Sequence, residues 1–232
     1  MNKFALRARS GALLTLTLTA SLAWADPMPD NTLRLGEYWV FYHASANDIS
    51  GPYVPADVNL SVKNVQTPYV AYLRTLSTHF TAELAFGVPP LTKTYGSGPA
   101  TLGSVPYNGQ YISSARWVAP TALIEYVFFD DSVRLRPYIG VGVNYTAFID
   151  RNSTPAGNAA SGGPTRIELP SSVGPAGTVG LTYRLPQHWS LMASYSASRV
   201  DSHLSAITAG TVRTTDISFG PQTFVFAVGY SF

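Results

Sequence analysis

The stretch FVFAVGYSF, from Phe224 to Phe232, carries two unlike sets of side chains in strict alternation. Phe, Phe, Val, Tyr and Phe occupy the even-numbered positions, and Val, Ala, Gly and Ser occupy the odd-numbered ones. A period of two is typical of a β-strand whose two faces meet different surroundings. The bulky face of this strand must therefore pack on a soluble core or face lipid.

The composition of the chain favours lipid. Only 12% of its 232 residues are charged and as many are aromatic, with 19 Gly, 17 Pro and no Cys. This is too little charge for an ordinary soluble surface, and the chain is too apolar and too periodic for disorder. The lack of Cys excludes a disulfide framework and thiolate metal sites. We expect neither a metal nor a cofactor.

Residues 1–25 are predicted to be a cleaved signal peptide. Lys3, Arg7 and Arg9 precede the apolar run Gly11–Leu22, and Ala-Trp-Ala at 23–25 is a cleavage site of small residues. The alternative is an N-terminal membrane anchor, but a spanning helix needs about 20 apolar residues. Cleavage lowers the Lys and Arg count from 15 to 12, against 13 Asp and Glu. A cationic nucleic-acid-binding surface is therefore not expected.

The remaining residues, 26–232, contain eight strand-like segments and no convincing amphipathic helix. They are Leu33–His43, Thr67–Leu76, Phe80–Val88, Trp117–Phe128, Arg134–Phe148, Ala176–Leu185, His188–Ser198 and Phe219–Phe232. Short connections alternate with long ones rich in Gly, Pro, Ser, Thr and Asn. This pattern predicts an all-β fold, an eight-stranded antiparallel transmembrane β-barrel with both termini in the periplasm. A soluble β-sandwich fits less well, because the small faces carry Gly and Ser rather than Lys and Glu.

Several of these segments resemble the OmpW family of outer-membrane proteins and its AlkL branch. The resemblance is carried by RPYIGVGVNYTAF at Arg136–Phe148, by PTALIEYVF at Pro120–Phe128, by the stretch Gly177–Ser202 and by the terminal Phe232. It implies an eight-stranded barrel in the outer membrane with a narrow apolar passage, a polar blockage below it and a lateral opening in the wall. It also suggests a short helix near Thr165–Leu169. Family members are associated with passive uptake of small hydrophobic compounds.

The interior of such a barrel is nearly filled by side chains. The alternation predicts a plug of paired charges in the periplasmic half, because an unpaired buried ion is costly. Its candidate members are Arg74, Glu83, Glu125, Arg136 and Arg184. The candidate lining of an apolar channel above the plug is Tyr38, Tyr72 and Phe148, with Met192 deeper down. Both sets are also consistent with a purely structural filling of the barrel.

Four prolines, at positions 68, 89, 90 and 120, cluster at the ends of the second to fourth strands. Proline cannot donate to the backbone ladder, so it weakens strand pairing locally. The cluster is consistent with a side exit from the barrel and equally with ordinary strand ends.

The resulting hypothesis is passive uptake of small hydrophobic molecules across the outer membrane, with lateral exit into the bilayer. The alternative is a structural or adhesive barrel whose loops contact phage, host or lipopolysaccharide. Catalysis is not expected, because none of His43, His79, His188 and His203 lies in mid-strand beside an outward Ser. The expected partners are outer-membrane lipid, lipopolysaccharide, small hydrophobic solutes and the barrel-assembly machinery, which reads the terminal strand.

Overall fold

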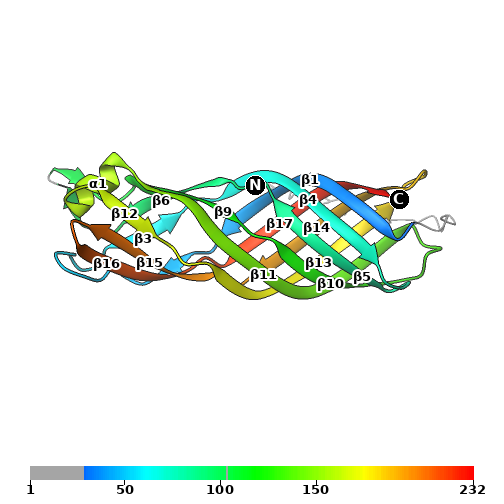
Figure 1. Ribbon diagram of the computed structural model, residues 1–232. Coiled ribbons are helices and arrows are strands. Elements are labelled where there is room, and N and C mark those ends of the chain that lie inside the picture. Colours follow the sequence, from blue (N-terminus) through cyan, green and yellow to red (C-terminus); the bar gives the residue numbers. More distant parts are fainter. Residues whose placement is uncertain (1–28, 103) are drawn as a thin grey trace, which may run out of the picture.

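The computed structural model describes residues 29–102 and 104–232, so the predicted signal peptide lies outside the described residues. Eight antiparallel strands close into a barrel in the order β1-β4-β5-β10-β11-β13-β14-β17, and β17 pairs again with β1 (Figure 1). These strands are β1 (Asn31–Tyr42), β4 (Val65–Thr75), β5 (Phe80–Gly87), β10 (Thr121–Val127), β11 (Leu135–Ser153), β13 (Ser172–Arg184), β14 (Trp189–Ser198) and β17 (Pro221–Ser231). The predicted eight-stranded antiparallel barrel is confirmed.

The long connections are not irregular loops. They form further strands at the extracellular end of the barrel, which we call the extracellular extension. Strands β9 (Tyr111–Val118), β6 (Leu91–Ser97) and β3 (Asn59–Val62) extend the barrel sheet from the upper half of β11. A four-stranded sheet consists of β12 (Thr165–Glu168), β15 (Asp201–Thr208), β16 (Thr211–Ser218) and β2 (Ser45–Ala46), and β7 (Thr101–Leu102) pairs with β8 (Val105–Pro106). At the other end of the molecule, short turns join the barrel strands (Figure 1). Outer-membrane barrels carry short turns on the periplasmic side.

The short helix lies at Pro155–Ser161 (α1), not near Thr165–Leu169 as the resemblance suggested. The Thr154 side chain accepts a hydrogen bond from the Gly157 N–H, and Pro155 occupies the first turn, where a missing N–H costs nothing. Gly162 ends the helix in the left-handed region. The following residues pair with β15 and form β12, so the helix cannot extend into them.

Large apolar side chains cover the outside of the barrel. Val141 is 72% exposed, Val173 68% and Phe226 57%. On β17 every bulky residue of the alternating terminal stretch faces outward, while Val225 and Ala227 are buried in the interior. A soluble core is therefore not what the bulky face meets. No helix among the described residues is long and apolar enough to cross a membrane.

Glycines on the inner face make room for large interior side chains. A Cβ at Gly87 would overlap the Tyr38 hydroxyl, and a Cβ at Gly180 would overlap the ring of Tyr138. An eight-stranded barrel is so narrow that large residues on one strand require small residues on the facing one. The inner glycines therefore determine where the aromatic side chains lie.

Glu37 is the exception on the lipid face. It belongs to the outward set of β1, between Leu35 and Trp39, and lies opposite Phe226 of β17 and Pro68 of β4. Among the described residues, no Lys, Arg or His nitrogen lies within 4.0 Å of its carboxylate. A charged side chain on the lipid face of a barrel is destabilising.

We predict that Glu37→Leu stabilises the barrel in lipid vesicles, by about 1 to 2 kcal/mol in the free energy of unfolding. Urea unfolding followed by tryptophan fluorescence measures this change. Leu35→Glu, which puts the charge one outward position lower on the same strand, is the matched control and should destabilise. A loss of stability in Glu37→Leu would contradict the prediction and would show that the carboxylate has a favourable contact in the membrane.

Candidate functional site

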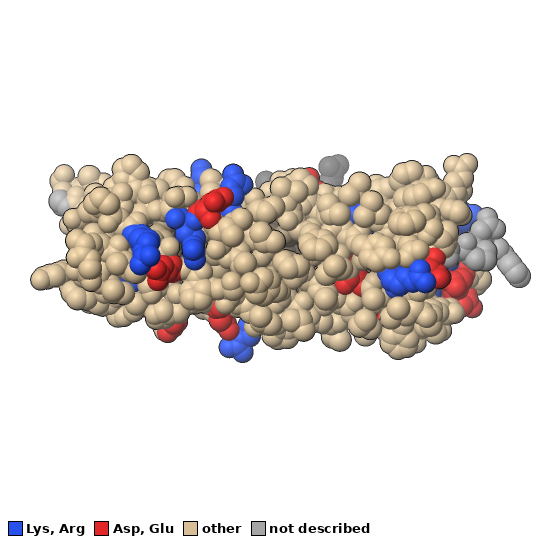
Figure 2. Space-filling view, viewed as in Figure 1, with Lys and Arg blue, Asp and Glu red and all other residues tan. Residues whose placement is uncertain are grey.

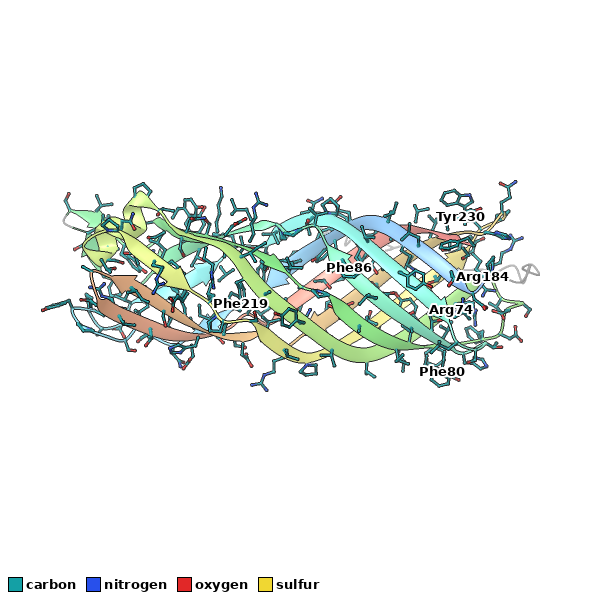
Figure 3. All side chains as sticks on the ribbon, viewed as in Figure 1. Arg74, Phe80, Phe86, Arg184, Phe219 and Tyr230 are labelled. Atoms are coloured by element: carbon teal, nitrogen blue, oxygen red, sulfur yellow. The ribbon has the colours of Figure 1, made fainter. Side chains whose placement is uncertain are left out.

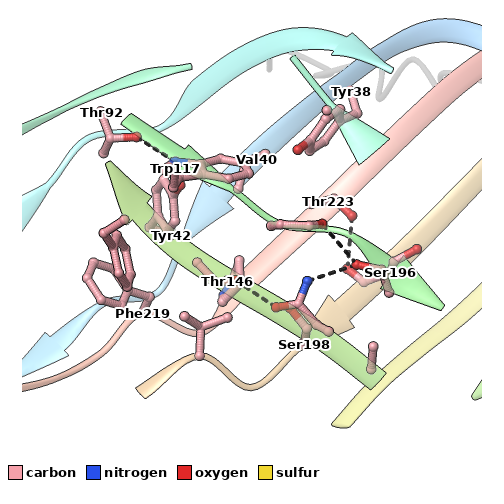
Figure 4. A pocket seen from close by; sticks show the side chains of 18 of the residues that line it. Tyr38, Val40, Tyr42, Thr92, Trp117, Thr146, Ser196, Ser198, Phe219 and Thr223 are labelled. Carbon is pink, nitrogen blue, oxygen red and sulfur yellow. Dashed lines mark hydrogen bonds between the residues drawn. The ribbon is translucent and has the colours of Figure 1, made fainter. Parts of the chain in front are cut away.

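A cavity occupies the barrel interior at the level where the barrel meets its extracellular extension (Figure 4). It contains about 1280 Å³ of space between protein atoms, its open mouth included. Side chains from barrel strands such as β1 and β17 and from extension strands such as β6 and β9 line it. The cavity is thus formed jointly by the barrel and by its extracellular extension.

Aromatic side chains are prominent in the upper wall of the cavity, which also carries the hydroxyl groups of Thr92, Thr94, Ser113 and Ser114 from β6 and β9. The ring centroids of Tyr38 and Trp117 lie 6.4 Å apart in an edge-to-face arrangement, and those of Phe148 and Phe219 lie 5.2 Å apart. The Trp117 indole N–H donates to the Thr92 hydroxyl at 2.9 Å, which fixes the ring against the wall. The aliphatic residues of this wall are Val40, Val62, Ile167, Leu169, Val200, Leu204 and Ile217. Such a surface favours an apolar molecule over water.

Hydroxyl and amide groups form the lower wall. The Asn144 amide nitrogen donates to the Thr121 hydroxyl at 2.8 Å, and the Thr146 hydroxyl donates to the Asn144 carbonyl oxygen at 2.7 Å. Across the barrel, Ser196 donates to the Thr178 hydroxyl at 2.9 Å. These groups satisfy one another, so the lower wall is polar without being charged.

A buried charged cluster closes the barrel below this polar wall. Arg34 donates to the Glu83 carboxylate at 2.8 Å, and the Tyr69 hydroxyl donates to the other oxygen of the same carboxylate at 2.8 Å. The Arg34 guanidinium also lies 5.7 Å from the centroid of the Tyr138 ring. Glu125, only 1% exposed, completes this inner cluster. Because Glu83 also lines the cavity, the inner cluster is its floor.

Arg136 and Arg184 form a separate outer cluster at the periplasmic end. Both guanidinium groups donate to one carboxylate oxygen of Asp131, at 2.8 and 2.7 Å. Arg136 also donates to the backbone carbonyl oxygens of Thr78 and Phe129. The predicted plug is therefore divided into two clusters, because Glu83 pairs with Arg34 while Arg136 and Arg184 pair with a turn aspartate.

Two of the predicted interior residues lie outside the barrel. Tyr72 is 43% exposed opposite outward Leu33, and its hydroxyl donates to Asn31. Arg74 is exposed beside Asp30, near the periplasmic end (Figure 3). The inward set of β4 is Thr67, Tyr69, Ala71 and Leu73, so the even-numbered positions face out.

The other predicted lining residues face inward. Tyr38 and Phe148 line the cavity. Met192 is buried below it, opposite Thr182, whose hydroxyl accepts a hydrogen bond from Arg34 of the inner cluster. Sequence reasoning missed Arg34 and Asp131. Arg34 lies between outward Leu33 and Leu35, so the alternation alone could have placed it inside the barrel.

The barrel wall is interrupted beside the cavity. The pairing of β5 with β10 ends at Ala85 opposite Thr121, and the pairing of β6 with β9 begins at Leu91 opposite Arg116, with the register shifted by one residue. Between them lie residues 86–90 and 117–120, where the three prolines at 89, 90 and 120 cannot donate to a ladder. We call this segment the wall break.

The cavity reaches both edges of the wall break. Phe86 and Gly87 line it from one edge, and Trp117 and Ala119 line it from the other. Phe86 is nonetheless 40% exposed on the outer surface of the barrel, where Figure 3 labels it midway along the molecule. At this point, therefore, only side chains separate the cavity from the surroundings of the barrel.

The two charge clusters predict a pattern of coupling. Arg34→Met should destabilise the barrel by about 3 kcal/mol or more, because it leaves a buried carboxylate without its cation. Adding Glu83→Met should recover part of this loss. By contrast, the losses in unfolding free energy caused by Glu83→Met and by Arg184→Met should be additive, because these residues belong to separate clusters. Urea unfolding of the single and double variants measures both effects. Additivity in the first pair, or strong coupling in the second, would refute the two-cluster arrangement.

Comparison with known proteins agrees with this architecture. The OmpW family model matches residues 32–232. Outer membrane protein W of Vibrio cholerae is 28% identical over 187 residues, covering 77% of this chain and 83% of that protein. Outer membrane protein W of Escherichia coli is 31% identical over 121 residues, which cover 52% of this chain and 56% of that protein.

Solved structures share the fold. The crystal structure of OprG from Pseudomonas aeruginosa superimposes with a TM-score of 0.79 at 19% identity, covering 91% of this chain and 98% of that one. The outer-membrane protein AlkL, determined in lipid bilayers, gives a TM-score of 0.64 at 18% identity, covering 100% and 97%. Because the family model spans nearly all the described residues, the chain belongs to the OmpW family of outer-membrane proteins.

Proposed function

We propose that this barrel carries small hydrophobic molecules passively across the outer membrane, from the extracellular end into the bilayer through the wall break. The observation that supports this most directly is the position of the cavity. It has an aromatic upper wall, a charged floor and an edge on each side of the interrupted ladder. The uptake associated with the family points the same way.

The charged floor of the cavity determines which way a solute can leave it. The Arg34–Glu83 pair and Tyr69 fill the barrel below the cavity, and Arg136 and Arg184 fill its periplasmic end. An apolar molecule entering this region would have to strip charged groups of their partners, which costs several kcal/mol. The sideways route needs only side-chain movement, because in the part of the chain that the structure describes no backbone hydrogen bond joins residues 86–90 to residues 117–120.

Transfer into the bilayer requires no energy source. An apolar solute gains roughly 25 cal/mol per Å² of surface removed from water. Lipopolysaccharide is a polar barrier that such solutes cross slowly, so a water-poor passage through it would speed their entry. The size and polarity of the cavity, rather than a reactive group, then determine which solutes pass.

A charge in the cavity should block entry. We predict that Phe148→Asp lowers uptake of an apolar solute into proteoliposomes at least tenfold, because a buried carboxylate holds water in the passage. Phe148→Leu should retain uptake. Tyr53→Asp adds the same charge at a fully solvent-facing loop residue, 92% exposed, and should have no effect. Equal uptake by all three variants and by empty liposomes would exclude transport and favour the structural or adhesive alternative.

A clamp across the wall break should block exit. The chain has no Cys, so the pair Val88→Cys and Val118→Cys places two unique thiols on opposite edges of the break, both on the outward face. We predict that a short bis-maleimide linker abolishes uptake in this variant. Leu84→Cys with Ala122→Cys is the matched control, because these residues pair directly in the intact ladder just below. Cross-linking the control should leave uptake unchanged.

The two experiments separate the parts of the proposal. Loss of uptake in Phe148→Asp together with full uptake in the clamped variant would retain transport but exclude exit through the wall break.

A further inference from the structure

Two lysines face each other on the outer surface just above the wall break. The Lys63 N–H donates to the Lys93 carbonyl oxygen at 3.1 Å, which continues the pairing of β3 with β6. The Lys63 ammonium lies 5.4 Å from the centroid of the Tyr95 ring, and that of Lys93 lies 5.5 Å from the Tyr111 ring. These two tyrosine rings are themselves neighbours, 5.7 Å apart. Both ammonium groups therefore lie over the same pair of neighbouring tyrosine rings.

This pair of like charges is uncompensated. Like charges directly opposite each other destabilise an antiparallel pair. Within residues 29–102 and 104–232, neither lysine has a carboxylate oxygen within 4.0 Å. The fold thus places two exposed cations side by side without a protein anion between them.

Arg116 adds a third cation. It lies opposite Leu91, and Lys93 lies opposite Ser114, so Arg116 and Lys93 are diagonal neighbours across β6 and β9. Its guanidinium donates to the Pro89 carbonyl oxygen at 2.9 Å, on the rim of the wall break, and lies 3.7 Å from Asp150. We call Lys63, Lys93 and Arg116 the basic patch. Figure 2 shows Lys and Arg side chains toward both ends of the molecule, while the middle of the visible wall is nearly free of them.

The basic patch marks the upper edge of the apolar belt. Below Lys93, the outward side chains of the same chain segment are Leu91, Val88, Phe86 and Leu84, all exposed. On β11 the outward apolar run Val141, Val143, Tyr145 ends at Ile149, which lies opposite Arg116. The patch is therefore at the height where the headgroups of outer-leaflet lipids meet the hydrocarbon.

We propose that the basic patch binds a phosphate group of lipid A and holds one lipopolysaccharide molecule over the wall break. Lipid A carries phosphates at this height in the outer leaflet, and a phosphate between Lys63 and Lys93 removes their repulsion. Arginine and lysine form charge-assisted hydrogen bonds with phosphate oxygens. The acyl chains of the bound lipid then lie along Leu91, Val88 and Phe86, on the outer side of the break. This inference does not depend on which solute the barrel carries.

The test compares lipids in nanodiscs of phosphatidylcholine that contain lipid A, lipid A without phosphates, or phosphatidylglycerol. Native mass spectrometry measures retained lipid, and thermal unfolding measures stabilisation. Wild type should retain phosphorylated lipid A at least tenfold more strongly than either other lipid. Lys63→Gln with Lys93→Gln should remove this preference, and Lys63→Arg with Lys93→Arg should keep it. Arg166→Gln with Arg199→Gln, which removes two cations from ion pairs elsewhere in the extension, is the matched control and should also keep it.

The difference in melting temperature between wild type and the double Gln variant should change sign when lipid A is added. In phosphatidylcholine alone, the double Gln variant should have a higher melting temperature than wild type, because the cross-strand repulsion is gone. With lipid A present, wild type should be the more stable of the two. Equal retention of lipid A by wild type and the double Gln variant, or equal binding of phosphatidylglycerol by wild type, would overturn the proposal. So would a double Gln variant that is less stable than wild type in every lipid.

Discussion

The closed backbone ladder in a hydrocarbon solvent is the constraint on which the rest of this structure depends. Inside the bilayer no water pairs with exposed N–H and C=O groups, so strands can span it only when every edge is joined. Eight strands are enough to close the sheet, but they leave an interior little wider than the side chains themselves. Glycines such as Gly87 and Gly180 then fix which interior sites hold a tyrosine.

The wall break relaxes this constraint locally, and it lies beside the cavity. Pro89, Pro90 and Pro120 have no N–H to leave unpaired, so an interruption there costs less than elsewhere. The Val88 N–H is satisfied by the Pro68 carbonyl oxygen of β4 at 3.0 Å. Cavity, floor and break therefore form one arrangement, in which the charged cluster fills the barrel below the cavity and the prolines interrupt the backbone ladder beside it.

Much of the barrel was predictable from sequence, because lipid and interior impose opposite demands on alternate residues. All eight spans were located, and the outward sets of β11, β13, β14 and β17 followed from parity. On β4 the two faces differ less, because each carries a tyrosine, so the alternation is weak there and the expectation that Tyr72 and Arg74 lie inside is wrong. Asp131 as the partner of Arg136 and Arg184 depends on how a turn folds back, which no periodicity encodes. The extracellular strands were missed because, in water, their two faces are not sorted as they are in lipid.

The central claim is that an apolar solute reaches the cavity and goes no deeper. Photolabelling of the protein in lipid bilayers with a small apolar diazirine, followed by peptide mapping of inward-facing residues, tests it most directly. The account predicts adducts on Trp117 and Phe148, and none on inward residues of the periplasmic half such as Ser190 and Arg184. Adducts on Ser190 or Arg184 at the level found on Trp117 would contradict it, because they would show that the charged floor does not stop the solute.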